Sequence, residues 1–182
     1  MPTIERKIRF DETTGQIYHS SERKISAAFD EEKGYLFWAR KNFSKQFQGI
    51  NFPKEMTMQE IGQMTVLAKK IWSNTNMLGY RGNGGIKPMN ISHIAKTICL
   101  KDRQTRNFLN KMIKLGVIAR VDIETDDRKE TQFYINPLYF FSSSRLPLNL
   151  YLIFRESLDQ HLPEWVIERF GKEELQARIS NV

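Results

Sequence analysis

The sequence predicts an α+β protein that is mainly α-helical and carries a small β-hairpin. Apolar residues recur at helical spacing in 91–98 and again in 103–115, two short stretches with a brief break between them. Alternating apolar and polar residues follow in VIARVDIE and TQFYIN, on either side of the polar turn TDDRKE. We therefore predict two helices joined by a tight turn and followed directly by a hairpin, and we interpret the rest of the chain around them.

The first of these helices, 91–98, directs its apolar residues to one face: Ile91, Ile94, Ala95 and Ile98. A four-residue break follows at 99–102, and Asp102 is predicted to cap the second helix, 103–115, at its N-terminus. The second helix is predicted to bury Thr105, Phe108, Leu109, Met112 and Leu115. Gly116 tolerates a left-handed backbone and is predicted to end this helix.

The other face of the second helix is polar and basic: Arg103, Gln104, Arg106, Asn107, Asn110, Lys111 and Lys114. From Lys101 to Lys114 five basic residues oppose one acid, a local net charge of +4. Arginine can bond two atoms of guanine, and asparagine or glutamine two atoms of adenine. An ordinary solvated face is the alternative, but such faces usually carry glutamate and this one has none. We therefore predict a recognition helix.

The predicted hairpin adds basic residues next to this helix. Its turn region, 124–131, contains Arg128 and Lys129. A basic hairpin after a recognition helix is the arrangement of a winged helix-turn-helix, in which the helix enters the major groove and the wing touches the DNA backbone. The stretch 57–72 supplies the supporting helix. It begins with the capping box Thr57-x-x-Glu60 and carries the apolar stripe Ile61, Met64, Leu67, Ala68, Ile71 and Trp72.

Composition agrees with a nucleic-acid partner. The net charge of +7 and the pI near 9.5 favour a polyanion as the binding partner. The single cysteine, Cys99, excludes an internal disulfide and is predicted to be buried. No signal peptide and no apolar run long enough for a bilayer is present, so we expect a cytoplasmic protein without a membrane partner.

The chain is predicted to divide into three parts. Residues 1–33 form a leader with a small hairpin inside 7–20, and its six basic residues against seven acidic ones do not suit a DNA-binding arm. Residues 34–140 form the winged domain. Residues 141–182 form a helical extension with helices at 147–158 and 163–179. Its apolar surface must be buried either on the first helix of the domain or against a second copy, and we expect a homodimer formed through these helices.

Two further stretches leave alternatives open. The segment 34–47 mixes aromatic and basic residues, which favours a core strand, with a stacking platform for single-stranded nucleic acid as the alternative. The glycine-bearing stretch 74–90 has no G-K-[ST] signature, so it is predicted to be a flexible loop and not a phosphate-binding loop. Arg81 and Lys87 within it are candidates for DNA-backbone contacts.

Catalysis is not expected from this sequence. The histidines His19, His93 and His161 lie in separate segments and have no ligand at metal spacing. We expect neither a metal nor a cofactor.

Three pieces of the chain carry a resemblance to a known family: Asp11 to Gly15 (DETTG), 109–118 (LNKMIKLGVI) and 133–137 (FYINP). In these pieces the chain resembles the RepL-like replication proteins of Gram-positive plasmids and their phage relatives, and more generally the winged-helix MarR-like regulators. The loop at 79–85 and the helices after Leu146 are extended relative to that pattern. The resemblance implies a protein that binds double-stranded DNA. Because an added oligomerisation or partner-binding tail suits a regulator, we expect a regulator of phage or plasmid genes. The alternatives are a replication initiator that binds origin repeats and a phage protein that uses the fold to bind a host protein.

Overall fold

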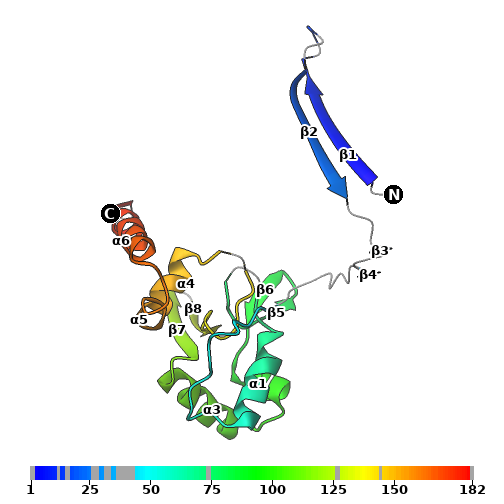
Figure 1. Cartoon of the computed structure of the whole chain (residues 1–182). Helices are drawn as coiled ribbons and strands as arrows, with labels where there is room; N and C mark the ends of the chain where they lie inside the picture. Colours follow the sequence, from blue (N-terminus) through cyan, green and yellow to red (C-terminus); the bar gives the residue numbers. More distant parts are fainter. Residues whose placement is uncertain are drawn as a thin grey trace. The chain divides into compact units, whose positions relative to one another are not determined.

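The computed structural model describes the chain except residues 1–2, 12, 15–16, 26–28, 31–33, 36–43, 73–74, 126–127, 144 and 181–182. The chain divides into two compact units, Met1–Arg40 and Lys41–Val182, which are described separately below. Helices and antiparallel two-stranded hairpins occur together, which confirms an α+β fold (Figure 1). Among the helices described, none combines the length and apolar character needed to cross a membrane.

The described residues of the first unit form two antiparallel strand pairs. Strands β1 and β2 form a long hairpin, and the short strands β3 and β4 form the second pair; their bounds are Thr3–Phe10, Ile17–Ile25, Phe29–Asp30 and Gly34–Tyr35. The Asp11 carboxylate accepts hydrogen bonds from the backbone N–H groups of Thr13 and Thr14 at 2.8 and 2.9 Å, which stabilises the turn. The predicted hairpin is confirmed, but it is longer than 7–20 because β2 continues through a polar stretch without alternation.

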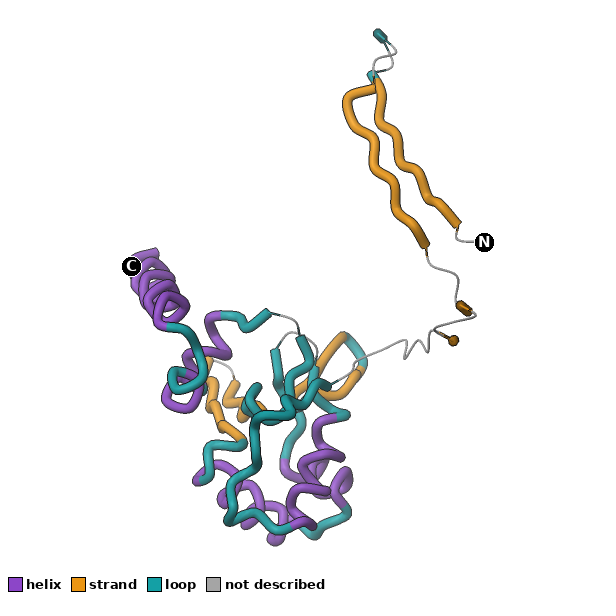
Figure 2. Tube along the Cα trace, in the orientation of Figure 1, coloured by secondary structure: helices purple, strands orange, loops and turns teal. Residues whose placement is uncertain are grey.

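The second unit contains six helices and two hairpins among its described residues (Figure 2). Their bounds are α1 Met58–Ala68, β5 Gly79–Gly82, β6 Gly85–Pro88, α2 Ile91–Ile98, α3 Asp102–Lys114, β7 Ile118–Thr125, β8 Arg128–Ile135, α4 Leu148–Ile153, α5 Arg155–Leu158 and α6 Glu164–Ser180.

Helix α1 begins as predicted and ends early. The Thr57 Oγ1 atom accepts a hydrogen bond from the Glu60 N–H at 3.2 Å, and Glu60 Oε2 accepts one from the Thr57 N–H at 2.7 Å, so the capping box is confirmed. The predicted end at residue 72 is wrong, because the helix stops at Ala68. Ile71 instead forms a β-bridge with Leu78. This pairing buries Ile71 without a helix.

Helices α2 and α3 lie where the sequence places them, but the cap of α3 differs. Asp102 is the first helical residue and not the cap, and its carboxylate accepts a hydrogen bond from Ser92 Oγ in α2 at 3.2 Å. The N-cap is Lys101, whose N–H donates to Gln104 Oε1 at 3.2 Å. Asp102 therefore joins the two helices, and the prediction that it caps α3 is wrong.

The C-terminal end of α3 confirms the role predicted for Gly116. Its φ is +68°, in the left-handed region. The Gly116 N–H donates to the Ile113 carbonyl at 3.0 Å, and the Val117 N–H donates to the Met112 carbonyl at 2.9 Å. This pair of bonds is the Schellman arrangement, which satisfies two carbonyls that the helix leaves unpaired.

The turn between α2 and α3 corrects the prediction for Cys99. This residue is the left-handed C-cap of α2, with φ +56°, and its side chain is exposed rather than buried. Ile98 before it is buried and Leu100 after it is partly buried. These two neighbours supply the apolar contacts of the turn, so the residue between them is left at the surface.

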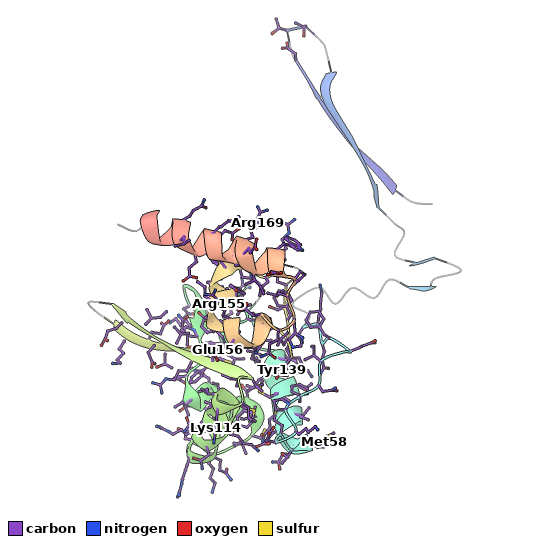
Figure 3. The ribbon with its side chains drawn as sticks, turned by 60° about the vertical axis from the view of Figure 1, so that its left-hand side comes forward. Met58, Lys114, Tyr139, Arg155, Glu156 and Arg169 are labelled. Atoms are coloured by element: carbon purple, nitrogen blue, oxygen red, sulfur yellow. The ribbon has the colours of Figure 1, made fainter. Side chains whose placement is uncertain are left out.

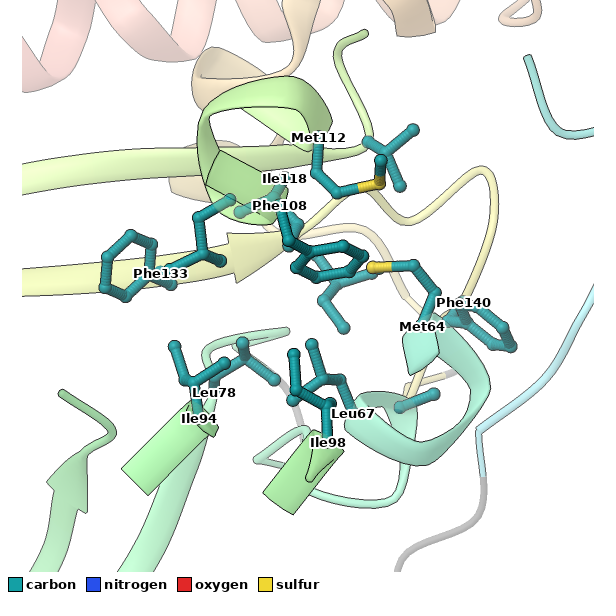
Figure 4. Close-up of a cluster of buried hydrophobic side chains, with 14 of the residues drawn as sticks. Met64, Leu67, Leu78, Ile94, Ile98, Phe108, Met112, Ile118, Phe133 and Phe140 are labelled. Carbon is teal, nitrogen blue, oxygen red and sulfur yellow. The ribbon is translucent and has the colours of Figure 1, made fainter. Parts of the chain in front are cut away.

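The main core lies between α1, α2, α3 and the β7–β8 hairpin. Figure 4 shows Met64 of α1, Ile94 of α2, Phe108 and Met112 of α3, and Phe133 of β8 in one cluster. Four of the inward positions predicted for α3 are confirmed as buried, and they are Thr105, Phe108, Leu109 and Met112. Leu115 is only partly buried and packs at the edge of this cluster. Apolar burial at these positions holds α3 with its opposite face outward.

The glycine-bearing stretch is not the predicted loop. It folds into the β5–β6 hairpin, with Gly82 paired to Gly85 across the turn. Gly84 and Gly85 have φ values of +88° and +125°, which side-chain-bearing residues rarely adopt. Just before this hairpin, the Leu78 N–H donates to the Phe133 carbonyl at 2.8 Å. The β5–β6 hairpin thus extends from a segment paired with β8.

The C-terminal helices form a second core with the β7–β8 hairpin. The predicted helix 147–158 is broken at Phe154, which separates α4 from α5. Tyr151 is fully buried and its ring stacks on Phe170 of α6 at 4.3 Å between centroids. Ala119 and Tyr134 of the hairpin also pack against this second core. The buried apolar residues of α4 and α5 are therefore covered within the chain by the hairpin and α6, and not by α1, whereas Leu152 of α4 is 38% exposed.

Candidate nucleic-acid interface

The outward face of α3 is an exposed polar stripe. The side chains of Arg103, Asn107, Asn110 and Lys114 are exposed and follow one another at steps of four, three and four residues, so they share one face. We call this set the α3 stripe. Figure 3 shows Lys114 at the C-terminal end of α3. Because the buried residues occupy the opposite side, the stripe is presented to solvent by a rigid, cored element.

Lys111 lies on the side of α3 that faces α1. Its Nζ atom is 2.8 Å from both carboxylate oxygens of Glu60, and its side chain is 38% exposed against 17% for Glu60. Burial raises the pKa of Glu60, but hydrogen bonds from Lys111 and from the Thr57 backbone outweigh it, so the pKa lies below its ordinary value. The predicted DNA contact Lys111 is thus bonded within the chain.

Gln104 and Arg106 lie on opposite flanks of the α3 stripe. Gln104 is exposed, and its Oε1 atom accepts the Lys101 N–H described above. Arg106 is exposed on the flank that faces the hairpins. The predicted face therefore has three parts. The α3 stripe lies in the middle, and Gln104 and Lys111 on one flank bond to the backbone and to α1. Arg106 on the other flank is open toward β7–β8.

The β7–β8 hairpin places Lys129 opposite Glu124. Their charged groups lie 3.4 Å apart, with side chains 70% and 75% exposed, so solvent screens this ion pair strongly. Lys129 can exchange such a partner for a phosphate at little cost. Arg128 begins β8, but its side chain and the neighbouring residues 126–127 lie outside the described part of the structure.

A groove of about 950 Å³ lies between the β5–β6 hairpin, the N-terminal ends of α2 and α3, and the β7–β8 hairpin. We call it the hairpin groove. Its charged lining residues are four cations and two acids: Lys87, Arg106, Arg120, Lys129, Asp102 and Glu130. The excess of positive charge suits the phosphates of a nucleic acid. The structure thus brings Lys87 together with Arg106 and Lys129.

Arg120 is the one cation of the four in the hairpin groove that the sequence did not lead us to predict. Its Nη2 atom lies 3.0 Å from Asp122 Oδ1, which also accepts a hydrogen bond from Thr131 Oγ1 at 2.6 Å. The Thr131 hydroxyl and then the Arg120 guanidinium hold the pKa of Asp122 below its ordinary value. The sequence did carry a signal, because Arg120 is a polar residue within the strand pattern VIARVDIE. Alternation places it on the same hairpin face as Ile118 and its cross-strand partner Phe133, which belong to the main core, but its side chain is exposed.

Comparison of the chain with family models, curated proteins and solved structures finds no match in any of the three. In the part of the chain that the structure describes, no three His, Cys, Asp or Glu residues gather as a metal site. The geometry of the site is that of an exposed helix face with amide and guanidinium side chains beside a basic groove.

Proposed function

We propose that the protein binds double-stranded DNA sequence-specifically, as a winged helix-turn-helix regulator of phage or plasmid genes. The observation that carries the proposal is the α3 stripe, which is exposed along its whole length while the other side of α3 is buried. The resemblance of 109–118 and 133–137 to RepL-like and MarR-like proteins supports the genetic setting.

In this proposal α3 lies in the major groove, which is wide enough to admit one α-helix. From Arg103 to Lys114 the α3 stripe spans about 16 Å along the helix axis, roughly five base-pair steps. Asn107 and Asn110 sit at its centre and can each bond two atoms of an adenine edge. Lys114 at the far end is placed for a backbone phosphate.

The hairpin groove complements the α3 stripe by binding the DNA backbone. Its cations come from two hairpins and from α3, so it reaches phosphates on the flank where Arg106 lies. In this arrangement the β7–β8 hairpin is the wing, and the β5–β6 hairpin adds Lys87 beside it. The acids Asp102 and Glu130 reduce the charge excess of the groove without cancelling it.

Selection of binding sites from a random duplex library, using the full chain, tests the proposal directly. We expect one shared motif, and a specific affinity about 10³-fold or more above that for random duplex at physiological salt. Immunoprecipitation of the native protein with its genomic DNA should recover the same motif upstream of genes. Binding that shows no motif and disappears as salt rises would contradict a sequence-specific role.

A further inference from the structure

Helix α6 presents large apolar side chains to solvent on the side away from its own core. Trp165 is 67% exposed and Leu175 is 62% exposed. The opposite side of α6 packs on the chain, where Phe170 stacks on Tyr151 and Glu174 lies 3.4 Å from Arg155. Figure 3 shows Arg169 on the side of α6 turned away from α4 and α5. A tryptophan held in water at this exposure lacks the burial that such a residue usually has.

The exposed side has the spacing of a helix-pairing seam. Trp165, Glu168, Lys172 and Leu175 follow one another at steps of three, four and three residues, the a and d positions of a heptad, and all four are exposed. We call them the α6 stripe. Its ends are apolar, and its centre carries one acid and one base. Within the described residues, neither Glu168 nor Lys172 forms an ion pair in the chain, whereas their neighbour Arg169 pairs with Glu173 at 3.7 Å.

We propose that the α6 stripe binds the α6 stripe of a second copy of this chain, with the two helices antiparallel. The order of the residues is self-complementary about position 170. Glu168 and Lys172 lie two residues on either side of it, and Trp165 and Leu175 lie five residues on either side. A two-fold axis beside this position therefore places each Glu168 against a Lys172 and each Trp165 against a Leu175.

The charges select this orientation over the parallel one. A parallel pair in register would place Glu168 on Glu168 and Lys172 on Lys172, which is repulsive in both layers. The antiparallel pair makes two ion pairs and covers both tryptophans. Because one helix pair is smaller than a standard interface, the dimer should be in exchange with monomer over the micromolar range.

Charge reversal tests the register in solution. Sedimentation equilibrium of the full chain, from about one micromolar to a few hundred micromolar, should show a monomer–dimer equilibrium. Glu168→Lys places two lysines in contact and Lys172→Glu two glutamates, so each variant alone should dimerise at least about tenfold more weakly. An equimolar mixture of the two variants should recover the dimer, because the lysine introduced in one variant then faces the glutamate introduced in the other. Circular dichroism should show unchanged helix content in both.

Glu156→Lys is the matched control, because it makes the same charge change at an exposed residue of α5 outside the α6 stripe. It should dimerise like the unchanged protein. A monomer at every concentration would overturn the proposal, and so would variants whose mixture stays monomeric. These measurements use no DNA, so their failure leaves the proposed function of α3 standing, and loss of DNA binding leaves the dimer standing.

Discussion

Lys111 of α3 and Glu60 of α1 form a bidentate ion pair, with the ammonium nitrogen 2.8 Å from each carboxylate oxygen. Glu60 at the same time accepts the Thr57 N–H that closes the capping box. One carboxylate therefore caps the supporting helix and attaches the helix that carries the exposed stripe. This double role makes the orientation of α3 depend on a residue 51 positions away in the chain.

Glu60→Gln should lower the free energy of unfolding by about 1–2 kcal/mol at neutral pH, because it weakens both the cap and the ion pair. Urea denaturation measures the loss. Glu156→Gln, an exposed carboxylate of α5, is the control and should stay within about 0.5 kcal/mol. An equal change in the two variants would show that the Glu60 contacts add nothing. In a double-mutant cycle, Lys111→Ala should couple with Glu60→Gln.

The Glu60 carboxylate should also make the free energy of unfolding depend on pH. The pKa of Glu60 is lower in the folded chain than its ordinary value of 4.5, so the unfolded chain takes up its proton first as the pH falls. This contribution is fully present above about pH 4.5 and is lost as the pH falls through the folded pKa. Denaturation curves between about pH 7 and about pH 3 should show the unchanged protein losing more stability than Glu60→Gln. Parallel losses would contradict the linkage.

Asn107→Ala should weaken binding to the selected duplex by about 1–3 kcal/mol and relax the preference at one base position. The Asn107 amide is at the centre of the α3 stripe. When it is removed, the base that it contacts is left without a hydrogen-bond partner. Fluorescence anisotropy on the selected duplex and on single-base variants measures both effects. Asn149→Ala removes an exposed amide from α4 and should change neither. Uniform weakening on all duplexes would assign Asn107 to the backbone.

Lys129→Ala and Lys87→Ala should each weaken binding to every duplex and reduce the salt slope by about one. Both residues line the hairpin groove, where their charge meets phosphates and not base edges. Titrations at several salt concentrations give the slope. Arg145→Ala removes an exposed charge outside the hairpin groove and should leave the slope unchanged. If either variant changed the preferred base at a position of the motif, the lysine would contact a base and not a phosphate.

Gly116→Ala should lower the free energy of unfolding by about 1 kcal/mol or more, since alanine is strained at φ +68°. Nothing lies within 4 Å of a methyl group added there, so the cost comes from the backbone alone. Gly62→Ala in α1 adds a methyl group to equally open space at a helical position and should be stabilising by about 0.5–1 kcal/mol. Urea denaturation compares the two. The same sign for both would contradict the argument from backbone conformation.

Local signals in the sequence determined a large part of the second unit. Helix α2 has the predicted bounds, the α1 capping box is confirmed, and Gly116 ends α3 as predicted. Each of these depends on residues within a few positions of one another: side-chain periodicity, a four-residue cap, or one backbone angle. The buried face of α3 was predictable for the same reason, and with it the outward face that carries the α3 stripe.

Only the tertiary structure decided features that join distant residues. Ile71 is not helical because it forms a β-bridge with Leu78. The glycine-bearing stretch forms a hairpin next to the segment that pairs with β8. Lys111 pairs with Glu60 across two helices. The sequence of α3 alone cannot show that a carboxylate of α1 lies beside it. The hairpin groove likewise exists only when β5–β6, α3 and β7–β8 meet. Local propensity sets the elements, whereas contacts between elements set their ends, partners and shared surfaces.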